Sequence, residues 1–167
     1  MSEKSSEYAL SLGSNLGGRE GYIRTAVREL SRICQIKSVS SLYSAESWGK
    51  KDDPEFINIA CIAASDLKPV VFLRYLHEIE LQSGRQRFVK WEPRVIDIDI
   101  LLAGKEIIDE NGLQIPHPYM TDRRFVLVPL AEIAPGMIHP VENVTVKELL
   151  KICSDKCKVS RMKSFNL

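Results

Sequence analysis

The sequence lacks a marked excess of charge of either sign. Its 167 residues carry 23 lysines and arginines against 22 aspartates and glutamates, which leaves a formal net charge of +1. Such a chain offers no strong electrostatic field to attract the phosphate backbone of a nucleic acid or an anionic membrane surface. We therefore expect no nucleic-acid partner and no membrane partner.

Long apolar runs are also missing. No stretch approaches the ~18 apolar residues that suggest a membrane-spanning helix, and the polar residues 1–6 do not resemble a signal peptide. We expect a cytoplasmic protein, so the four cysteines are interpreted as reduced thiols. Repeats, low-complexity segments and linkers are absent, which predicts a single domain over residues 1–167 with its core at about 7–150, and a monomer is expected.

The most informative pattern is a pair of aspartates, Asp97 and Asp99, inside a segment rich in isoleucine and valine. The alternation predicts a β-strand, so both aspartates and Val95 share one face while isoleucines fill the other. Two carboxylates roughly 7 Å apart on a half-buried strand repel each other. Mg²⁺ relieves this repulsion because it binds one or two carboxylates and completes its shell with waters and phosphate oxygens. The alternative is an exposed sheet face on which both aspartates are simply solvated.

Basic residues crowd the positions just before this strand, at Arg85, Arg87, Lys90 and Arg94. Planar guanidinium groups can form paired hydrogen bonds with phosphate oxygens. Arginines opposite a magnesium site are typical of enzymes that move phosphoryl groups. A solvated basic loop that balances the acids is the alternative.

Two further positions suggest ligand binding. Prolines on both sides of His117 restrict the backbone, and Arg123 follows, so this segment is interpreted as a second phosphate contact or, alternatively, as a rigid turn. Asn58 interrupts an apolar strand, where its amide needs partners. Those partners are either a neighbouring loop or the donor–acceptor edge of a flat heterocycle. Candidate aromatic walls for such a ring are Trp48, Phe56, Trp91 and Phe125.

The periodicity predicts an α+β fold of the ferredoxin-like split βαβ class, in which a βαββαβ core forms an antiparallel sheet with helices on one face. The expected strands cover residues 8–12, 36–46, 56–64 and the aspartate segment, and the expected helices cover 19–33 and 68–83. In the second helix Val70, Leu73, Leu76 and Ile79 are expected to face the sheet. A helical extension is expected from 146 to about 156, after which the last ten residues are expected to fray.

Taken together, these motifs resemble the 6-hydroxymethyl-7,8-dihydropterin pyrophosphokinase family of the folate pathway. The resemblance covers roughly residues 7–150, and the order and spacing of its segments make it specific. The segments are 8–17, 41–44, 54–58, 80–87, 93–99, 116–117 and 123–130.

The resemblance implies that the β,γ-pyrophosphate of ATP moves as a unit to the hydroxymethyl oxygen of the pterin, and that AMP leaves. It implies two Mg²⁺ ions on Asp97 and Asp99, which together with Arg85 and Arg94 are the expected catalytic residues. The expected ATP contacts are Leu73, His77, Glu80, Arg85, Arg87, Arg94, Ile100, His117 and Arg123. The expected pterin contacts are Ala45, Trp48, Phe56, Asn58, Trp91 and Phe125.

Other functions fit the sequence less well. A ferredoxin-like module that binds a pterin or a nucleotide without turnover is the main alternative. A module that reads RNA needs paired aromatic residues on its central strands and a basic surface, and this chain offers neither. A generic transferase built on the two aspartates leaves Asn58 and residues 116–117 unexplained.

Overall fold

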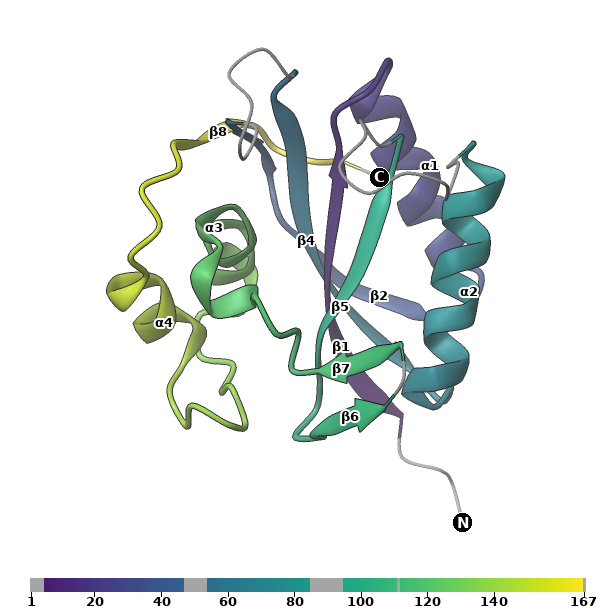
Figure 1. Ribbon diagram of the computed structural model, residues 1–167. Coiled ribbons are helices and arrows are strands. Elements are labelled where there is room, and N and C mark those ends of the chain that lie inside the picture. Colours follow the sequence, from purple (N-terminus) through teal and green to yellow (C-terminus); the bar gives the residue numbers. More distant parts are fainter. Residues whose placement is uncertain (1–4, 47–53, 85–94, 111, 167) are drawn as a thin grey trace.

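The computed structural model describes residues 5–46, 54–84, 95–110 and 112–166. Within these ranges the chain forms an antiparallel sheet of six strands, a separate two-stranded sheet, four α-helices and a 3-10 helix (Figure 1). The strands are β1 (Ser6–Ser14), β2 (Gln35–Val39), β3 (Leu42–Ala45), β4 (Phe56–Ser65), β5 (Asp97–Ala103), β6 (Ile108–Glu110), β7 (Leu113–Ile115) and β8 (Val159–Lys163). The helices are α1 (Arg19–Leu30), α2 (Pro69–Gln82), η1 (Met120–Asp122), α3 (Arg124–Ile133) and α4 (Val146–Ile152). None of the described helices is long and apolar enough to cross a bilayer.

The strands of the large sheet follow the order β5-β1-β4-β3-β8, and β2 pairs with β4 beside β3. The central strand β1 therefore has β4 on one side and β5 on the other. Its register places Gly13 opposite both Asn58 of β4 and Asp97 of β5, while Ser11 lies opposite Asp99. One row across three strands thus contains the predicted heterocycle-binding amide and one of the predicted metal ligands.

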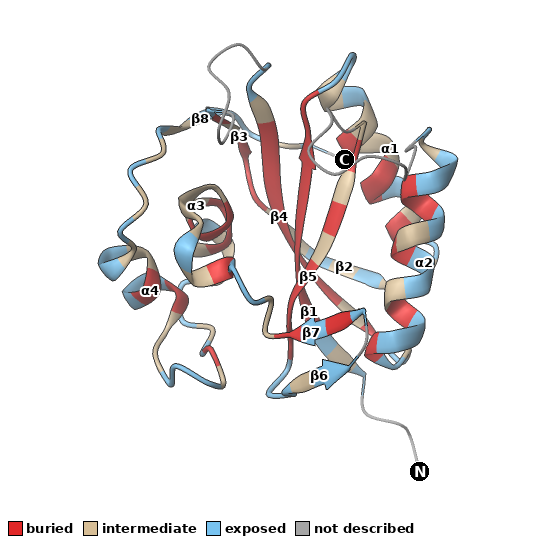
Figure 2. Ribbon diagram, viewed as in Figure 1, coloured by how far each residue is buried: buried red, intermediate tan, exposed pale blue. Residues whose placement is uncertain are grey.

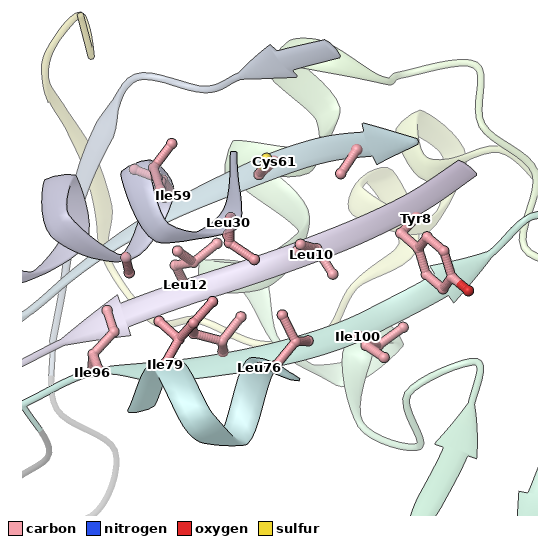
Figure 3. Close-up of a cluster of buried hydrophobic side chains, with 14 of the residues drawn as sticks. Tyr8, Leu10, Leu12, Leu30, Ile59, Cys61, Leu76, Ile79, Ile96 and Ile100 are labelled. Carbon is pink, nitrogen blue, oxygen red and sulfur yellow. The ribbon is translucent and has the colours of Figure 1, made fainter. Parts of the chain in front are cut away.

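Side chains alternate along β1 and fill two separate hydrophobic layers. Tyr8, Leu10 and Leu12 pack beneath α1 and α2, whereas Ala9 faces α3 and α4 on the opposite side. Figure 3 shows side chains of β1, α1, α2 and β5 converging in the first layer. Figure 2 shows α1 and α2 with their buried sides toward one face of the sheet, and α3 on the other side with α4 beyond it. Helices α1 and α2 of the expected core lie on one face, but the expectation of helices on one face alone is wrong for the whole sheet, because α3 buries the second face and α4 packs on α3.

The first helix agrees with its predicted start at residue 19 but ends at Leu30, three residues early. Its buried side chains Ile23, Ala26, Val27 and Leu30 belong to the predicted apolar face. The second helix begins at Pro69, where a missing backbone N–H has no cost because the first helical N–H groups lack partners within the helix.

The predicted apolar face of α2 is partly wrong. Val70 is 38% exposed, whereas Phe72 is fully buried together with Leu76. The buried positions run through Pro69, Phe72, Leu76 and Ile79, a spacing of three or four residues that follows the helical period. Phe72 anchors this face because its ring packs 4.4 Å from the ring of Tyr8, measured between centroids.

The predicted strand over residues 36–46 is two strands, β2 and β3, both paired with β4. They are separated at Ser40, whose backbone N–H donates to the carbonyl of Ala60 while its Oγ accepts from the N–H of Ala60, each at 2.9 Å. The serine hydroxyl thus takes the place of a backbone acceptor and interrupts the ladder.

The C-terminal segment also differs from its prediction. Helix α4 begins at the predicted residue 146 but ends at Ile152. The expected fraying of the last ten residues is wrong, because β8 pairs with β3 at the sheet edge. A 2.8 Å ion pair joins Lys163 to Glu20 of α1, and Arg24 of the same helix lies over the ring of Phe165. These contacts tie the end of the chain to the first helix.

Candidate functional site

Asp97 and Asp99 lie at the start of β5 and face away from the layer under α1 and α2. The intervening Ile98 and the next residue, Ile100, are 2% and 4% exposed within that layer, whereas both aspartates remain partly exposed. The predicted alternation is confirmed here, because burying isoleucine on one face leaves the carboxylates on the other.

The backbone between the two aspartates is held by Glu80 of α2. Its Oε1 accepts a 2.7 Å hydrogen bond from the N–H of Ile98, and the glutamate itself is 1% exposed. Strand β5 ends the order of the large sheet and pairs there with β1 alone, so N–H groups on its outer edge need partners from outside the sheet. Glu80 supplies one and thereby fixes the strand that carries both aspartates.

An open cavity of about 590 Å³ runs along this edge of β5, between α2 and the β6–β7 hairpin. Its volume is within the range of small-molecule sites. Its lining residues are Leu73, His77, Glu80, Asp97, Ile98, Asp99, Ile100, Asp109, Glu110, Gly112, Leu113, Gln114, His117 and Pro118. Seven residues of the predicted ATP and metal sites are therefore brought together in one cavity: Leu73, His77, Glu80, Asp97, Asp99, Ile100 and His117.

The described wall of this cavity is rich in carboxylates and contains neither lysine nor arginine. Its acids come from α2, β5 and the β6–β7 hairpin: Glu80, Asp97, Asp99, Asp109 and Glu110. A polyphosphate binds beside these carboxylates favourably only when cations accompany it, because like charges repel strongly where water is partly excluded.

His117 presents one ring nitrogen to the aspartates. Its Nδ1 accepts a 3.1 Å hydrogen bond from the N–H of Tyr119, and its own backbone N–H donates to the carbonyl of Leu101. Burial, followed by the positive charge of Arg123, lowers the pKa of His117 to about 4, although Asp97 opposes this shift. The imidazole is therefore neutral at pH 7 with its proton on Nε2, which lies 4.0 Å from Oδ2 of Asp99.

Arg123 precedes α3 and lies between two aromatic rings. Its guanidinium carbon is 5.0 Å from the ring centroid of Tyr119 and 5.8 Å from that of Phe125. These contacts restrict the long side chain by packing and by cation–π attraction. They keep a fixed positive charge close enough to affect His117.

Asn58 is buried as predicted, at 2% exposure. Its Nδ2 has no hydrogen-bond partner among the described residues. A buried amide N–H that lacks a partner destabilises the protein by the full free energy of its lost hydration. This donor is therefore suited to a ligand that supplies an acceptor.

Three other predicted pterin residues surround the same part of the sheet. Phe56 pairs with Ala45 across β3 and β4, two residues along the strands from the pair formed by Asn58 and Tyr43. Phe125 belongs to α3, which packs on the Asn58 face of the sheet with Ala60 and Ile62 in its layer. The remaining predicted residues, Trp48, Arg85, Arg87, Trp91 and Arg94, lie outside the described ranges.

Sequence reasoning did not identify the contribution of the β6–β7 hairpin. This hairpin lines the cavity with Asp109 and Gln114, which share a 3.0 Å hydrogen bond. Its signal in the sequence is the Asn-Gly pair at 111–112, which favours a tight hairpin turn. Three-residue strands give too little alternation to stand out around that pair.

Comparison with known proteins identifies the family of the chain. Residues 9–135 match the family model for 7,8-dihydro-6-hydroxymethylpterin-pyrophosphokinase (HPPK). The chain is 39% identical over 139 residues to the 2-amino-4-hydroxy-6-hydroxymethyldihydropteridine pyrophosphokinase of Aquifex aeolicus, covering 83% of this chain and 87% of that protein. It is 43% identical over 126 residues to the enzyme of the same name from Bacillus subtilis, covering 74% and 75% of the two chains.

Among solved structures, the wild-type HPPK-DHPS protein of Plasmodium falciparum matches with a TM-score of 0.70 at 17% identity, which shows a shared fold. The match covers 89% of this chain but 44% of the Plasmodium chain. The family model and the two bacterial relatives, each matched over most of the chain, carry the assignment. The chain belongs to the HPPK family, the pyrophosphokinases of folate biosynthesis.

Proposed function

We propose that this protein transfers pyrophosphate from ATP to 6-hydroxymethyl-7,8-dihydropterin, giving the pterin diphosphate and AMP. The observation that carries the proposal is the row formed by Asn58, Gly13 and Asp97 across β4, β1 and β5. A ring held at Asn58 has its substituent directed along the sheet toward carboxylates beside a nucleotide-sized cavity. The acceptor hydroxyl and the phosphate chain then meet over β1.

The nucleotide belongs in the cavity along β5. Leu73, His77 and Ile100 contribute to the walls that would hold the nucleoside. Glu80 lines the same cavity and also accepts the hydrogen bond from the N–H of Ile98. The triphosphate then extends toward Asp97 and Asp99.

Asp97 and Asp99 are the residues that would hold two Mg²⁺ ions. The chemistry of the donors fits, because magnesium in nucleotide sites uses one or two carboxylates and takes its other ligands from water and phosphate. The described residues contain no group of three or more His, Cys, Asp or Glu side chains arranged for a metal, so a fully protein-bound ion is not expected there. Bound magnesium would neutralise phosphate charge and polarise the group that is transferred.

His117, beside Asp99, and Arg123 would bind the phosphate chain. A neutral imidazole with its proton on Nε2 is a hydrogen-bond donor that adds no full charge, and Arg123 supplies one fixed cation. Arg85, Arg87 and Arg94, outside the described ranges, are proposed as the further phosphate-binding groups. Cations on the side opposite the carboxylates would balance charge that spreads over the transferred group.

The pterin would be recognised by Asn58, with Phe56 and Phe125 against its ring and the backbone of Ala45 at its edge. Support comes from the buried Nδ2 of Asn58, which has no partner in the described part of the chain. Trp48 and Trp91, which lie outside that part, are proposed to complete the pterin site.

The reaction then depends mainly on orientation. The hydroxymethyl oxygen attacks the β-phosphorus, the bond from that phosphorus to the oxygen bridging to the α-phosphate breaks, and AMP leaves with that oxygen. The proton of the hydroxyl passes to water. Holding the two reactants in line removes much of the entropic barrier of a reaction between separate molecules.

The same proposal extends to the fold and assembly. The order β5-β1-β4 with β2 and β3 beyond β4, and α1 and α2 on one face, supports a ferredoxin-like core from β1 to β5 in which β2 and β3 together take the place of one strand. We further propose that residues 1–167 act as one pyrophosphokinase domain, as a monomer and in the cytoplasm.

The test is to incubate the purified protein with ATP, Mg²⁺ and 6-hydroxymethyl-7,8-dihydropterin and to measure AMP and ADP. We expect AMP and pterin diphosphate in equal amounts, and neither when EDTA is present or pterin is omitted. Formation of ADP would indicate a simple phosphotransferase. Pterin binding without nucleotide turnover would support the alternative of a binding module.

A further inference from the structure

Gly13 stands in the interior of β1, where glycine weakens a strand because it has no side chain to pack and loses more backbone entropy than other residues. Its neighbours on the same face are Asn58 on one side and Asp97 on the other. Gly13 is not among the glycines with positive φ, so backbone conformation does not explain its presence. The side chains above its Cα explain why position 13 is a glycine.

A Cβ atom at position 13 would lie 2.7 Å from Oδ1 of Asn58 and 3.7 Å from Cδ1 of Phe56. A contact of 2.7 Å is shorter than real Cβ atoms tolerate, so either Asn58 or the strand would have to move. The amide oxygen of Asn58 therefore lies over the backbone of Gly13. Because β1 separates β4 from β5, this orientation directs the side chain from β4 toward the strand of Asp97.

The buried environment makes this orientation matter. Asn58 is 2% exposed, and its Nδ2 lacks a hydrogen-bond partner among the described residues. Rotating the amide away from Gly13 would also rotate that donor, since both atoms belong to one planar group. The absence of a side chain at position 13 thus determines the orientation of both Nδ2, the donor, and Oδ1, the acceptor, of Asn58.

We infer that Gly13 is a positioning residue for pterin recognition: it leaves the room in which Asn58 lies over β1 with its amide directed to the substrate ring. This inference rests on the proposed function. Gly13 acts through Asn58, whose Oδ1 is the atom nearest to its missing Cβ, whereas Phe56 at 3.7 Å is at ordinary van der Waals distance. Pterin binding therefore depends on Gly13, whereas ATP binding does not.

The test measures equilibrium binding of 6-hydroxymethyl-7,8-dihydropterin in the presence of Mg²⁺ and a non-hydrolysable ATP analogue. The proteins are wild type, Gly13→Ala, Asn58→Ala and the double variant. We expect Gly13→Ala to weaken pterin binding by about tenfold or more, as loss of a hydrogen-bonded buried amide does. In the Asn58→Ala background the same change should have little effect, because the residue through which it acts is gone.

Two controls separate this role from a general loss of structure. Gly21→Ala adds a methyl group where nothing lies within 4 Å, so it should leave pterin binding unchanged. Gly13→Ala should still unfold in one cooperative thermal transition, which shows that it is folded, and its binding of the ATP analogue without pterin should be unchanged.

Equal pterin affinity of Gly13→Ala and wild type would overturn the inference, as would equal losses in the wild-type and Asn58→Ala backgrounds. A crystal structure of Gly13→Ala with Asn58 unmoved would overturn it independently of any ligand. Failure of wild type to bind pterin and release AMP is a different result, because it would reject the proposed function.

Discussion

Asp97 and Asp99 owe their position to the residues between and after them. Ile98 and Ile100 must be buried, so the strand period leaves both carboxylates on the opposite face. Two adjacent carboxylates on one strand face do not stabilise the fold. Their presence in the sequence therefore indicates a binding role, and this can be inferred without the structure. The row that joins Asp97 to Asn58 is not predictable in this way, because it depends on the register of three strands and on a glycine between them.

Asp97→Asn removes one negative charge with almost no change in shape. We expect turnover to fall by about 10²–10³-fold or more, as loss of an electrostatic positioning group does. Pterin affinity should change little, since Asn58 is on β4. The measurement is AMP release under saturating substrates, together with direct pterin binding.

The matched control is Asp66→Asn, because Asp66 is exposed and follows the far end of β4. It should retain normal turnover. Near-normal activity of Asp97→Asn would reject the metal assignment, whatever the control shows.

Glu80 provides a second test at the residue scale. Glu80→Ala leaves the N–H of Ile98 without its 2.7 Å acceptor inside a buried site. We expect the free energy of unfolding to fall by about 1–3 kcal/mol, the usual cost of an unsatisfied buried polar group. Glu80→Gln keeps an oxygen acceptor and should lose less. Urea unfolding followed by circular dichroism measures both, and equal losses would argue against the hydrogen bond as the cause.

At the scale of elements, the carboxylate of Glu132 links α3 to β3 and to Ser41 just before it. Glu132 of α3 accepts hydrogen bonds from the N–H and Oγ of Ser41 and from the hydroxyl of Tyr43, at 3.0, 2.8 and 2.7 Å. Arg161 of β8 donates to the same serine Oγ at 2.9 Å. Burial opposes ionisation, yet the hydrogen bonds from Tyr43 and Ser41 keep the pKa of Glu132 below its ordinary value. This contact holds α3, with Phe125 and the adjoining Arg123, against the sheet.

Glu132→Ala should therefore cost more than an equivalent change within one helix. We expect a loss of about 1–2 kcal/mol in the free energy of unfolding, since the Tyr43 and Ser41 donors lose their acceptor. The comparison is Glu29→Ala, which breaks a 2.6 Å ion pair with Arg32 at the end of α1 and should cost no more than ~0.5 kcal/mol. Denaturant unfolding of the two variants measures both losses of unfolding free energy. Similar losses would mean that the hydrogen bonds of Glu132 do not stabilise the contact between α3 and β3.

The elements missed by sequence reasoning have physical reasons in common. Helix α3 contains Pro129, which usually interrupts a helix, and tertiary packing in the second layer overrides that preference. Strand β8 is mostly polar and exists because β3 offers an unpaired edge far away in the sequence. By contrast β1, β4, α1 and α2 are defined by their own periodicity, so their existence is predictable and only their ends are not.

The whole molecule buries apolar side chains on both faces of one sheet, and the site lies where this burial is incomplete. On the second face, Asn58, Asp97 and Asp99 flank the Gly13 end of β1 and belong to neither hydrophobic layer. A sheet stabilised from both sides can tolerate such a polar region. The two carboxylates and the amide that we propose bind substrates thus lie outside both hydrophobic layers.

Stability of the whole protein should also depend on a histidine remote from the proposed site. The Nδ1 of His139 accepts from the N–H groups of Val141 and Glu142, at 3.3 and 3.1 Å. Burial lowers the pKa of His139, with Glu142 opposing. The folded protein therefore binds fewer protons than the unfolded chain below the ordinary histidine range. The sign follows directly: stability is lost as the pH falls through about 6.5 and is recovered as the pH rises.

The decisive comparison is wild type against His139→Asn at pH 7.5 and pH 5.5, where carboxylates remain ionised. Asparagine keeps an oxygen acceptor for the two N–H groups but does not titrate. Wild type should lose more stability between these pH values than the variant, by less than about 1 kcal/mol once solvent screening is allowed for. His117, whose pKa burial lowers to about 4, contributes equally to both proteins and cancels in the difference. Identical pH dependence in urea unfolding would show that the loop tolerates a protonated His139, and that its hydrogen bonds do not hold the loop in place.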